Sequence, residues 1–167
     1  MILVHGAGSF GHLRAKHWRL NEGRLPNAQF ENDEKCKTQI EAVLAVRQEM
    51  LELNAHVCYA LEQVDLTPVV HPPHLWAQNT GPNFTGDLQR FKHQLPRQVH
   101  VTFGDVVDVE SDEQFGILSG DDLVARLAIE LPSVKRLVFA IKGVDGILRV
   151  PPEHSNEGDL IQNWSPE

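Results

Sequence analysis

The chain has 167 residues, of which 41% are hydrophobic and 23% charged, a composition typical of one globular domain with a sizeable core. Its formal net charge is −8, which argues against general binding to nucleic acids. The apolar stretches span only a few residues, so we expect no signal peptide and no membrane span, and we expect a cytoplasmic protein.

The first predicted element is a strand over Met1–Val4, followed by the glycine-rich run His5–His12 and a helix that opens at Leu13. Glycines let a backbone approach a ligand closely. A strand, a glycine loop and a helix in this order point free backbone N–H groups and the positive end of a helix dipole at one place, which suits a phosphate. Residues 1–21 hold three cationic side chains and no acid, namely Arg14, Lys16 and Arg19.

Residues 20–34 are polar and rich in turn formers, which predicts a loop or a lid. Hydrophobic residues then recur at helical spacing from Glu34 to about Val64, which predicts one long helix. Both cysteines, Cys36 and Cys58, fall within that predicted helix. We therefore expect two reduced thiols rather than a disulfide.

A short strand is predicted over Pro68–His71, and Pro72 and Pro73 end it. Residues 74–87 are predicted to be irregular and residues 88–95 to be helical. The two histidines of the His71–His74 motif have no Cys or acidic ligand at a supporting spacing, which favours a structural turn over a metal pair.

A strand is predicted over Gln98–Phe103, ending in Gly104–Asp105, and another over Phe115–Leu118. Ser119 is a typical N-cap for the amphipathic helix that follows it, with Asp121 in the first turn. A final buried strand is predicted over Val134–Ile141. Among the acids in the middle of the chain, Asp105 alone is not assigned to a solvated loop.

Strands that alternate with helices predict an α/β fold, a three-layer αβα sandwich with a mostly parallel sheet covered on both faces. Ligands of such sheets bind at the carboxyl ends of the strands. Three loops are predicted to meet there: residues 5–12, residues 104–105 with 119–121, and residues 142–146.

The particular residues allow a narrower interpretation. The quoted motifs are His-Gly-Ala-Gly-Ser-Phe-Gly-His at 5–12 with Ala15, Pro68-Val69-Val70, Gly104-Asp105-Val106-Val107-Asp108, Ile117-Leu118-Ser119-Gly120-Asp121 and Val144-Asp145-Gly146. In this order they closely resemble isopentenyl phosphate kinases, which belong to the amino acid kinase superfamily together with aspartate, glutamate and uridylate kinases. The resemblance extends over about residues 2–150.

The resemblance implies transfer of the γ-phosphoryl group of ATP, with Mg²⁺, to isopentenyl phosphate, giving isopentenyl diphosphate for isoprenoid biosynthesis. It assigns catalytic roles to His12, which hydrogen-bonds the substrate phosphate, and to Asp121, which organises the polar centre. The implied substrate-binding residues are Gly6, Ala7, His12 and Gly120, and the implied nucleotide-binding residues are Gly8, Asp145 and Gly146. No residue is assigned as a metal ligand.

The chain also departs from that family. Family members begin with a further strand, whose lysine and Gly-Gly-Ser loop bind the ATP phosphates, and they continue into a nucleotide-binding half. The Thr-Asp that usually precedes Val-Asp-Gly is replaced by Ile141-Lys142-Gly143. The resemblance thus implies that residues 1–167 form one partial domain, the acceptor-substrate half. We expect this chain alone to show little or no turnover. We also expect it to form a homodimer or to associate with a complementary chain.

Several alternatives stay open at this point. The chain is either such a kinase, a kinase of another small phosphate or phosphonate, or a non-catalytic phosphate-binding or interaction module derived from one. Lys16 lies one turn after His12 and either reaches an anion or is solvated. Three aromatic residues either line an apolar pocket or pack in the core, with packing as the expectation: Trp76, Phe84 and Phe91.

Overall fold

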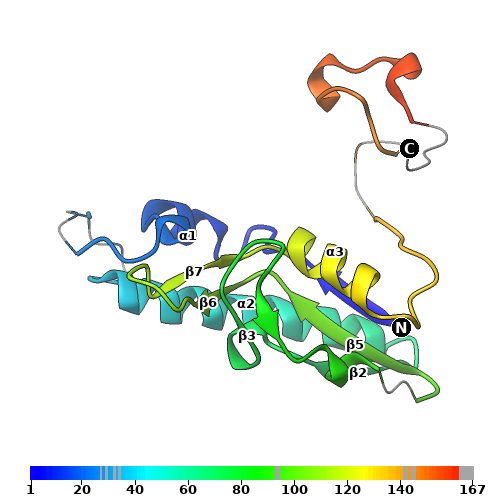
Figure 1. Cartoon of the computed structure of the whole chain (residues 1–167), viewed down its shortest axis with the longest axis horizontal. Helices are drawn as coiled ribbons and strands as arrows, with labels where there is room; N and C mark the ends of the chain where they lie inside the picture. Colours follow the sequence, from blue (N-terminus) through cyan, green and yellow to red (C-terminus); the bar gives the residue numbers. More distant parts are fainter. Residues whose placement is uncertain are drawn as a thin grey trace. The chain divides into compact units, whose positions relative to one another are not determined.

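The computed structural model describes residues 1–26, 28, 30–31, 33, 35–92, 95–140, 143 and 146–161. The chain divides into two compact units, Met1–Val134 and Lys135–Glu167, which are treated separately below (Figure 1). No helix among the described residues is long and apolar enough to cross a membrane.

A parallel sheet lies at the centre of the first unit. Its middle strand β5 (Gln98–Phe103) pairs on one side with β1 (Ile2–His5) and on the other with β2 (Thr67–Val70) (Figure 1). His5 is in register with Phe103, and both pairings are parallel. From Val99 onward every residue of β5 is buried, as expected for a parallel strand covered on both faces. The predicted strands at 1–4, 68–71 and 98–103 are therefore confirmed.

A second, smaller sheet has the strand order β4-β3-β6-β7. It consists of β3 (Ala77–Gln78), β4 (Thr85–Gly86), β6 (Asp105–Asp108) and β7 (Phe115–Leu118). The sequence predicts β7 but not β6, because only one residue, Gly104, separates β6 from β5. β6 pairs with β7 in an antiparallel hairpin, so not all strands of this unit are parallel.

Three α-helices accompany the sheets. α1 spans His12–His17, α2 spans Gln39–Glu62 and α3 spans Gly120–Glu130. The predicted N-cap of α3 is confirmed, because the Ser119 side chain accepts a hydrogen bond from the Asp122 amide at 3.0 Å.

The predicted start of the long helix at Glu34 is wrong. Thr38 caps α2 by accepting a hydrogen bond from the Glu41 amide at 3.2 Å, so the helix begins at Gln39. Cys36 consequently lies before the helix rather than in it. Both cysteines are free thiols, as predicted.

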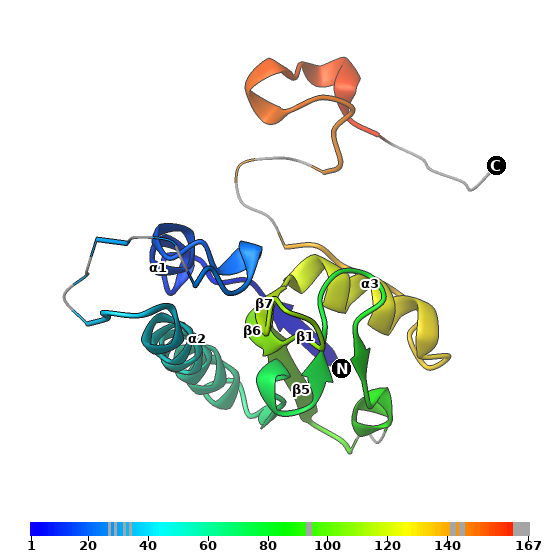
Figure 2. The same ribbon diagram turned by 60° about the vertical axis from the view of Figure 1, so that its left-hand side comes forward.

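The helices cover opposite faces of the parallel sheet, with α2 on one side and α3 on the other (Figure 2). Ile2 and Val4 of β1 pack into the cluster on the α3 side. That cluster contains Trp76, Ala77, Phe84, Leu88, Phe91, Val107, Leu118, Leu123, Leu127 and Leu131. On the α2 side, Phe103 and Val106 pack with Val43, Val46 and Met50. The three-layer arrangement is thus present in this unit, and Trp76, Phe84 and Phe91 are core residues.

Short 3₁₀ helices fill the connections. η1 spans Leu20–Glu22, η2 spans Pro73–Leu75 and η3 spans Leu88–Phe91. η2 confirms that the two prolines begin a turn. The segment predicted as helical at 88–95 forms a helical turn over Leu88–Phe91, and residues 93 and 94 lie outside the described residues.

The strand predicted over Val134–Ile141 is wrong for its described part, residues 134–140, which form no regular element. Leu137, Val138 and Phe139 are 47%, 74% and 55% exposed. A strand needs a neighbour to pair its backbone groups, and within the described residues this segment has none. The second unit otherwise contains η4 (Pro152–His154), η5 (Glu157–Asp159) and an isolated bridge between Leu148 and Leu160.

Candidate functional site

The glycine loop connects β1 to α1 through a tight turn. The amide of Phe10 donates to the carbonyl of Ala7 at 2.9 Å, and Gly8 has a φ of +55°, a conformation that favours glycine. A Cβ added at Gly6 or Gly8 would meet no atom within 4 Å, so this side of the loop is open. In the described part of the chain nothing accepts a hydrogen bond from the Ala7 and Gly8 amides, which leaves them available to an anion.

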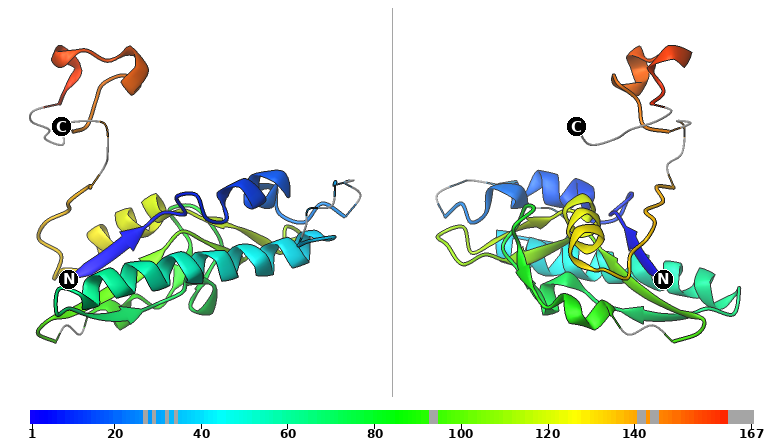
Figure 3. Two further views of the ribbon diagram at one scale, coloured as in Figure 1. Left: turned by 180° about the vertical axis from the view of Figure 1, so that it is seen from behind. Right: turned by 45° about the vertical axis from the view of Figure 1, so that its right-hand side comes forward.

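The closing glycine of the loop holds it against α2. Gly11 has a φ of +66°, and a Cβ there would lie 3.2 Å from Cγ1 of Val46. The next residue, His12, begins α1, which lies beside the N-terminal half of α2 (Figure 3). Close approach of loop and helix thus requires a glycine at this position.

The second predicted loop reaches the same edge of the parallel sheet. The Gly104 amide donates to the His5 carbonyl at 3.1 Å. A Cβ at Gly104 would lie 3.3 Å from the Gly120 nitrogen, and a Cβ at Gly120 would lie 3.7 Å from the His5 oxygen. The predicted meeting of the 5–12 loop with residues 104–105 and 119–121 is therefore correct.

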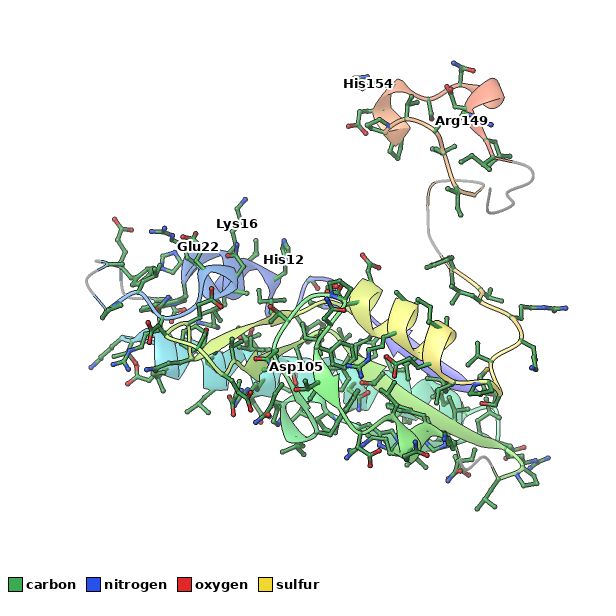
Figure 4. The ribbon with its side chains drawn as sticks, in the orientation of Figure 1. His12, Lys16, Glu22, Asp105, Arg149 and His154 are labelled. Carbon is green, nitrogen blue, oxygen red and sulfur yellow. The ribbon has the colours of Figure 1, made fainter. Side chains whose placement is uncertain are left out.

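The two predicted catalytic side chains are both exposed. His12 projects away from the body of its unit, in the same direction as Lys16 (Figure 4). Asp121 lies in the first turn of α3, where the neighbouring Asp122, rather than Asp121, pairs with the Ser119 hydroxyl at 2.8 Å. The His12 amide donates to the Phe10 carbonyl at 2.7 Å, but within the described residues the His12 and Asp121 side chains make no hydrogen bond or ion pair, so their roles stay predictions.

The predicted nucleotide-binding residues do not all lie within one described unit. Asp145 lies outside the described residues, as does Lys142. Gly146 belongs to the second unit, where a Cβ added to it would lie 2.9 Å from Cδ1 of Leu160. A shared site for Gly8, Asp145 and Gly146 stays a prediction.

The structure contains a charged cluster on the side of α1 that faces α2, and the sequence did not predict it. Arg14 donates from Nε and Nη2 to Oε1 of Glu49 at 3.0 and 2.9 Å, and from Nη1 to Asp33. Nη1 also lies 3.6 Å from Sγ of Cys36. The sequence analysis identifies Arg14 only as one of three cations in residues 1–21, because its partners come from segments that only the fold brings near.

His5 supports the loop from the opposite end. Its Nε2 lies 3.3 Å from Oδ1 of the buried Asn54 on α2, and its ring centroid lies 5.0 Å from that of Phe103. The residue that ends β1 is thereby fixed to both the helix and the neighbouring strand.

A pair of histidines joins β5 to the end of β2. Nε2 of His71 lies 2.8 Å from Nδ1 of the buried His100. Burial lowers the pKa of His71 to about 4, with further lowering by His100 and Arg90, because burial disfavours the protonated form. His71 is therefore neutral at neutral pH.

Asp105 is buried, which agrees with its separation from the solvated acids in the sequence. Its Oδ2 accepts from Nδ1 of His74 at 2.6 Å, and its Oδ1 accepts from the Val106 amide at 2.8 Å. The pair fastens η2 to the junction of β5 and β6. No group of three or more His, Cys, Asp or Glu side chains among the described residues could hold a metal ion.

Two shallow cavities lie near α1. One, of about 350 Å³, runs along the glycine loop and is lined by Ser9, Phe10, Gly11, Leu13, Arg14, Lys35, Glu49 and Glu52. The other, of about 390 Å³, lies between residues 24–26, 28 and 30 and the start of α2, with Trp18, Leu25, Pro26, Phe30 and Ile40 among its walls. Neither includes Trp76, Phe84 or Phe91.

Comparison with known proteins gives consistent results. The amino acid kinase family matches residues 1–167. An isopentenyl phosphate kinase of Methanothermobacter thermautotrophicus is 30% identical over 165 residues, covering 96% of this chain and 59% of that protein. One of Methanocaldococcus jannaschii is 32% identical over 150 residues, covering 89% and 53%. The chain thus spans between half and three fifths of the length of these relatives.

Solved structures agree on the fold. An X-ray structure of isopentenyl phosphate kinase superposes with a TM-score of 0.75 at 26% identity, covering 91% of this chain and 59% of that one. A product complex of the Thermoplasma acidophilum isopentenyl phosphate kinase gives a TM-score of 0.66 at 23% identity, covering 93% and 59%. The first unit therefore carries part of the fold of these enzymes.

Proposed function

The chain belongs to the amino acid kinase family, and from that membership we propose that it forms the acceptor side of a phosphotransferase acting on isopentenyl phosphate. The reaction moves the γ-phosphoryl group of ATP onto the acceptor and yields isopentenyl diphosphate, a step of isoprenoid biosynthesis. The observation that carries the proposal is the open glycine loop with its unbonded Ala7 and Gly8 amides, which ends in the exposed His12.

In this proposal, backbone amides and the His12 side chain together bind the acceptor phosphate. The amides of Gly6 and Ala7 donate to its oxygens, and His12 donates from a ring nitrogen, which needs no full charge. Gly120 contributes its amide from the start of α3, and Asp121 beside it organises the polar centre. Phosphoryl transfer depends mainly on positioning and charge stabilisation, and this part of the protein supplies the positioning.

In the proposed reaction an oxygen of the bound acceptor phosphate forms a bond to the γ-phosphorus, and the bond from that phosphorus to the β–γ bridging oxygen breaks, releasing ADP. Mg²⁺, which enters with the phosphates of ATP, offsets their negative charge. Gly8, Asp145 and Gly146 are proposed to contact the nucleotide. His12 and the loop amides keep the acceptor oxygen facing the γ-phosphorus.

A ligand panel tests the acceptor class. Isothermal titration calorimetry with isopentenyl phosphate, methyl phosphate and isopentenol separates the contribution of the phosphate from that of the hydrocarbon. We expect isopentenyl phosphate to bind, methyl phosphate to bind more weakly and isopentenol not to bind. Tighter binding of methyl phosphate would favour another small phosphate as acceptor, and binding of no phosphate would overturn the proposal.

Turnover is tested by ³¹P NMR of the protein incubated with ATP, Mg²⁺ and isopentenyl phosphate, which resolves isopentenyl diphosphate and ADP. A protein that binds the acceptor without forming either product would favour the non-catalytic module.

We also propose self-association as a homodimer or association with a complementary chain. α2 supports this by exposing Ile40, Leu44 and Tyr59 at 49%, 58% and 63%, and light scattering after size exclusion measures it.

A further inference from the structure

α1 is too short to keep its orientation unaided. It has six residues and no side-chain N-cap hydrogen bond, and an isolated helix of that length is not stable in water. Its direction, and that of the His12 side chain, must therefore be set by contacts with the rest of the first unit. Ala15 and Trp18 supply the apolar contacts. The polar contacts come from Arg14 and from His17, whose Nε2 lies 2.7 Å from the Glu31 carbonyl oxygen.

The Arg14 guanidinium joins three segments of the chain. It binds Glu49 on α2 at 2.9 and 3.0 Å, and it binds Asp33 in the connection that precedes α2. The side chains of Arg14, Glu49 and Asp33 are only 15%, 16% and 23% exposed. Removing one partner of such a largely buried cluster leaves charge without compensation.

Asp33 is itself held in place before it meets Arg14. It accepts hydrogen bonds from Nε1 of Trp18 at 3.0 Å and from the Lys35 amide at 2.8 Å, and also from the Cys36 amide. Burial would raise the pKa of this carboxyl, but these hydrogen bonds and the charge of Arg14 outweigh it and hold the pKa well below its usual range. The carboxylate therefore stays charged and fixed.

Helical geometry connects this cluster to the phosphate site. Successive residues of an α-helix are rotated by about 100°, so residues two apart point to nearly opposite sides. Arg14 faces α2 while His12 and Lys16 face outward (Figure 4). A rotation of α1 about its axis would therefore change the direction in which His12 projects.

We propose that Arg14, anchored by Glu49 and Asp33, is a positioning residue of the acceptor site that sets the direction of His12. This inference rests on the proposed function, because it takes His12 as the group that binds the phosphate. Arg14 acts through α1 and does not touch the substrate.

Arg47 provides a matched control. Its side chain is 18% exposed, close to the value for Arg14, and it donates from Nε to the Val106 carbonyl and from Nη2 to Asp108, both at 2.8 Å. It joins α2 to β6, and among the described residues it makes no hydrogen bond or ion pair with α1. A substitution of Arg47 therefore removes a largely buried arginine but leaves the Arg14 contacts that orient α1 in place.

The experiment compares Arg14→Gln with Arg47→Gln, both checked for folding by circular dichroism. Calorimetry measures the affinity for isopentenyl phosphate, and ¹H–¹³C NMR follows the His12 ring. We expect Arg14→Gln to weaken binding by about tenfold, because a displaced His12 loses its hydrogen bond to the charged phosphate, and to shift the His12 resonance. Arg47→Gln should change the affinity by less than about twofold, because distant sites act independently.

Equal affinities and an unmoved His12 resonance in the two folded variants would overturn the inference. If Arg14→Gln does not fold, Arg14→Lys replaces it, because lysine keeps the charge but lacks the planar fork that binds Glu49 through two nitrogens. Failure of the proposed function is recognised separately, since His12→Ala would then leave the affinity unchanged. A loss of binding in His12→Ala without one in the Arg14 variant rejects the positioning role alone.

Discussion

The amide nitrogen of Gly104 lies 3.1 Å from the carbonyl oxygen of His5, so the chain leaving β5 is hydrogen-bonded to the residue at which β1 ends. Gly120, at the start of α3, approaches the same carbonyl. Three segments that are distant in the sequence therefore meet at the carboxyl edge of the parallel sheet, where ligands of such sheets bind.

Gly6→Ala should weaken binding of isopentenyl phosphate without destabilising the protein. The added methyl group would meet no atom of the described residues within 4 Å, but it would project into the space that we assign to the phosphate. We expect a stability change within about 0.5 kcal/mol, as at other unconstrained surface positions. Urea denaturation and calorimetry measure the two effects, and unchanged affinity would place the phosphate elsewhere.

Gly11→Ala, unlike Gly6→Ala, should destabilise the protein. Its φ of +66° and the 3.2 Å approach of Val46 both oppose a side chain, so we expect a loss of about 1–2 kcal/mol. Urea denaturation beside Gly6→Ala as control measures it. Equal stability of the two variants would show that the loop does not need this glycine.

Stability should fall as the pH is lowered from about 6.5, the ordinary pKa of histidine, towards 4. The folded-state pKa of His71 is lowered to about 4, chiefly by burial, so the unfolded chain binds a proton in this range that the folded protein excludes. The contribution is complete above the unfolded pKa and is lost as the pH falls, by at most about 1.4 kcal/mol per pH unit.

Urea denaturation between pH 7 and pH 4 measures that slope, with His71→Gln as the comparison because glutamine can still hydrogen-bond but does not titrate. The variant should show a shallower acid slope than the unmodified protein. The same slope in both proteins would mean that other groups cause the acid sensitivity.

Asp105→Asn should destabilise the first unit strongly. The Asp105 side chain is fully buried and accepts hydrogen bonds from Nδ1 of His74 at 2.6 Å and from the Val106 amide at 2.8 Å. Asparagine replaces one acceptor oxygen by a donor, and a buried group left without its hydrogen-bond partner costs about 1–3 kcal/mol. Asp108→Asn is the matched control, because Asp108 also accepts a hydrogen bond from a side chain, that of Arg47, but its own side chain is 66% exposed. Thermal denaturation of both variants tests this, and similar melting temperatures would contradict the assigned importance of the His74 contact.

The parts of the fold that were predictable depend on local patterns. The glycine loop, the Ser119 cap and the buried strand β5 each follow from residues that lie next to one another in the sequence. β6 was missed because only a single glycine, Gly104, separates it from β5. The start of α2 was misplaced because a single capping residue, Thr38, determines where the helix begins. The segment 134–140 has the composition of a strand, yet composition does not supply the neighbour with which a strand must pair.

The site shows the same division. The motifs predict a site at Gly6, Ala7, His12 and Gly120, which stays a prediction, and the structure brings the His5 carbonyl at the start of the loop near Gly120. The Arg14 cluster and the His74–Asp105 pair were not identifiable, because each joins residues from separate segments. Such contacts depend on the packing of α1, α2 and the second sheet, which no local pattern encodes.

The most direct test of the central claim is the affinity of His12→Ala for isopentenyl phosphate, measured by calorimetry beside His17→Ala. His17 also lies on α1, but its Nε2 is occupied by the Glu31 carbonyl at 2.7 Å. A hydrogen bond to a charged group contributes about 1.5–3 kcal/mol, so His12→Ala should bind at least about tenfold more weakly while His17→Ala stays near the unmodified protein. An unchanged affinity in a folded His12→Ala protein would contradict the assignment of the acceptor phosphate to this loop.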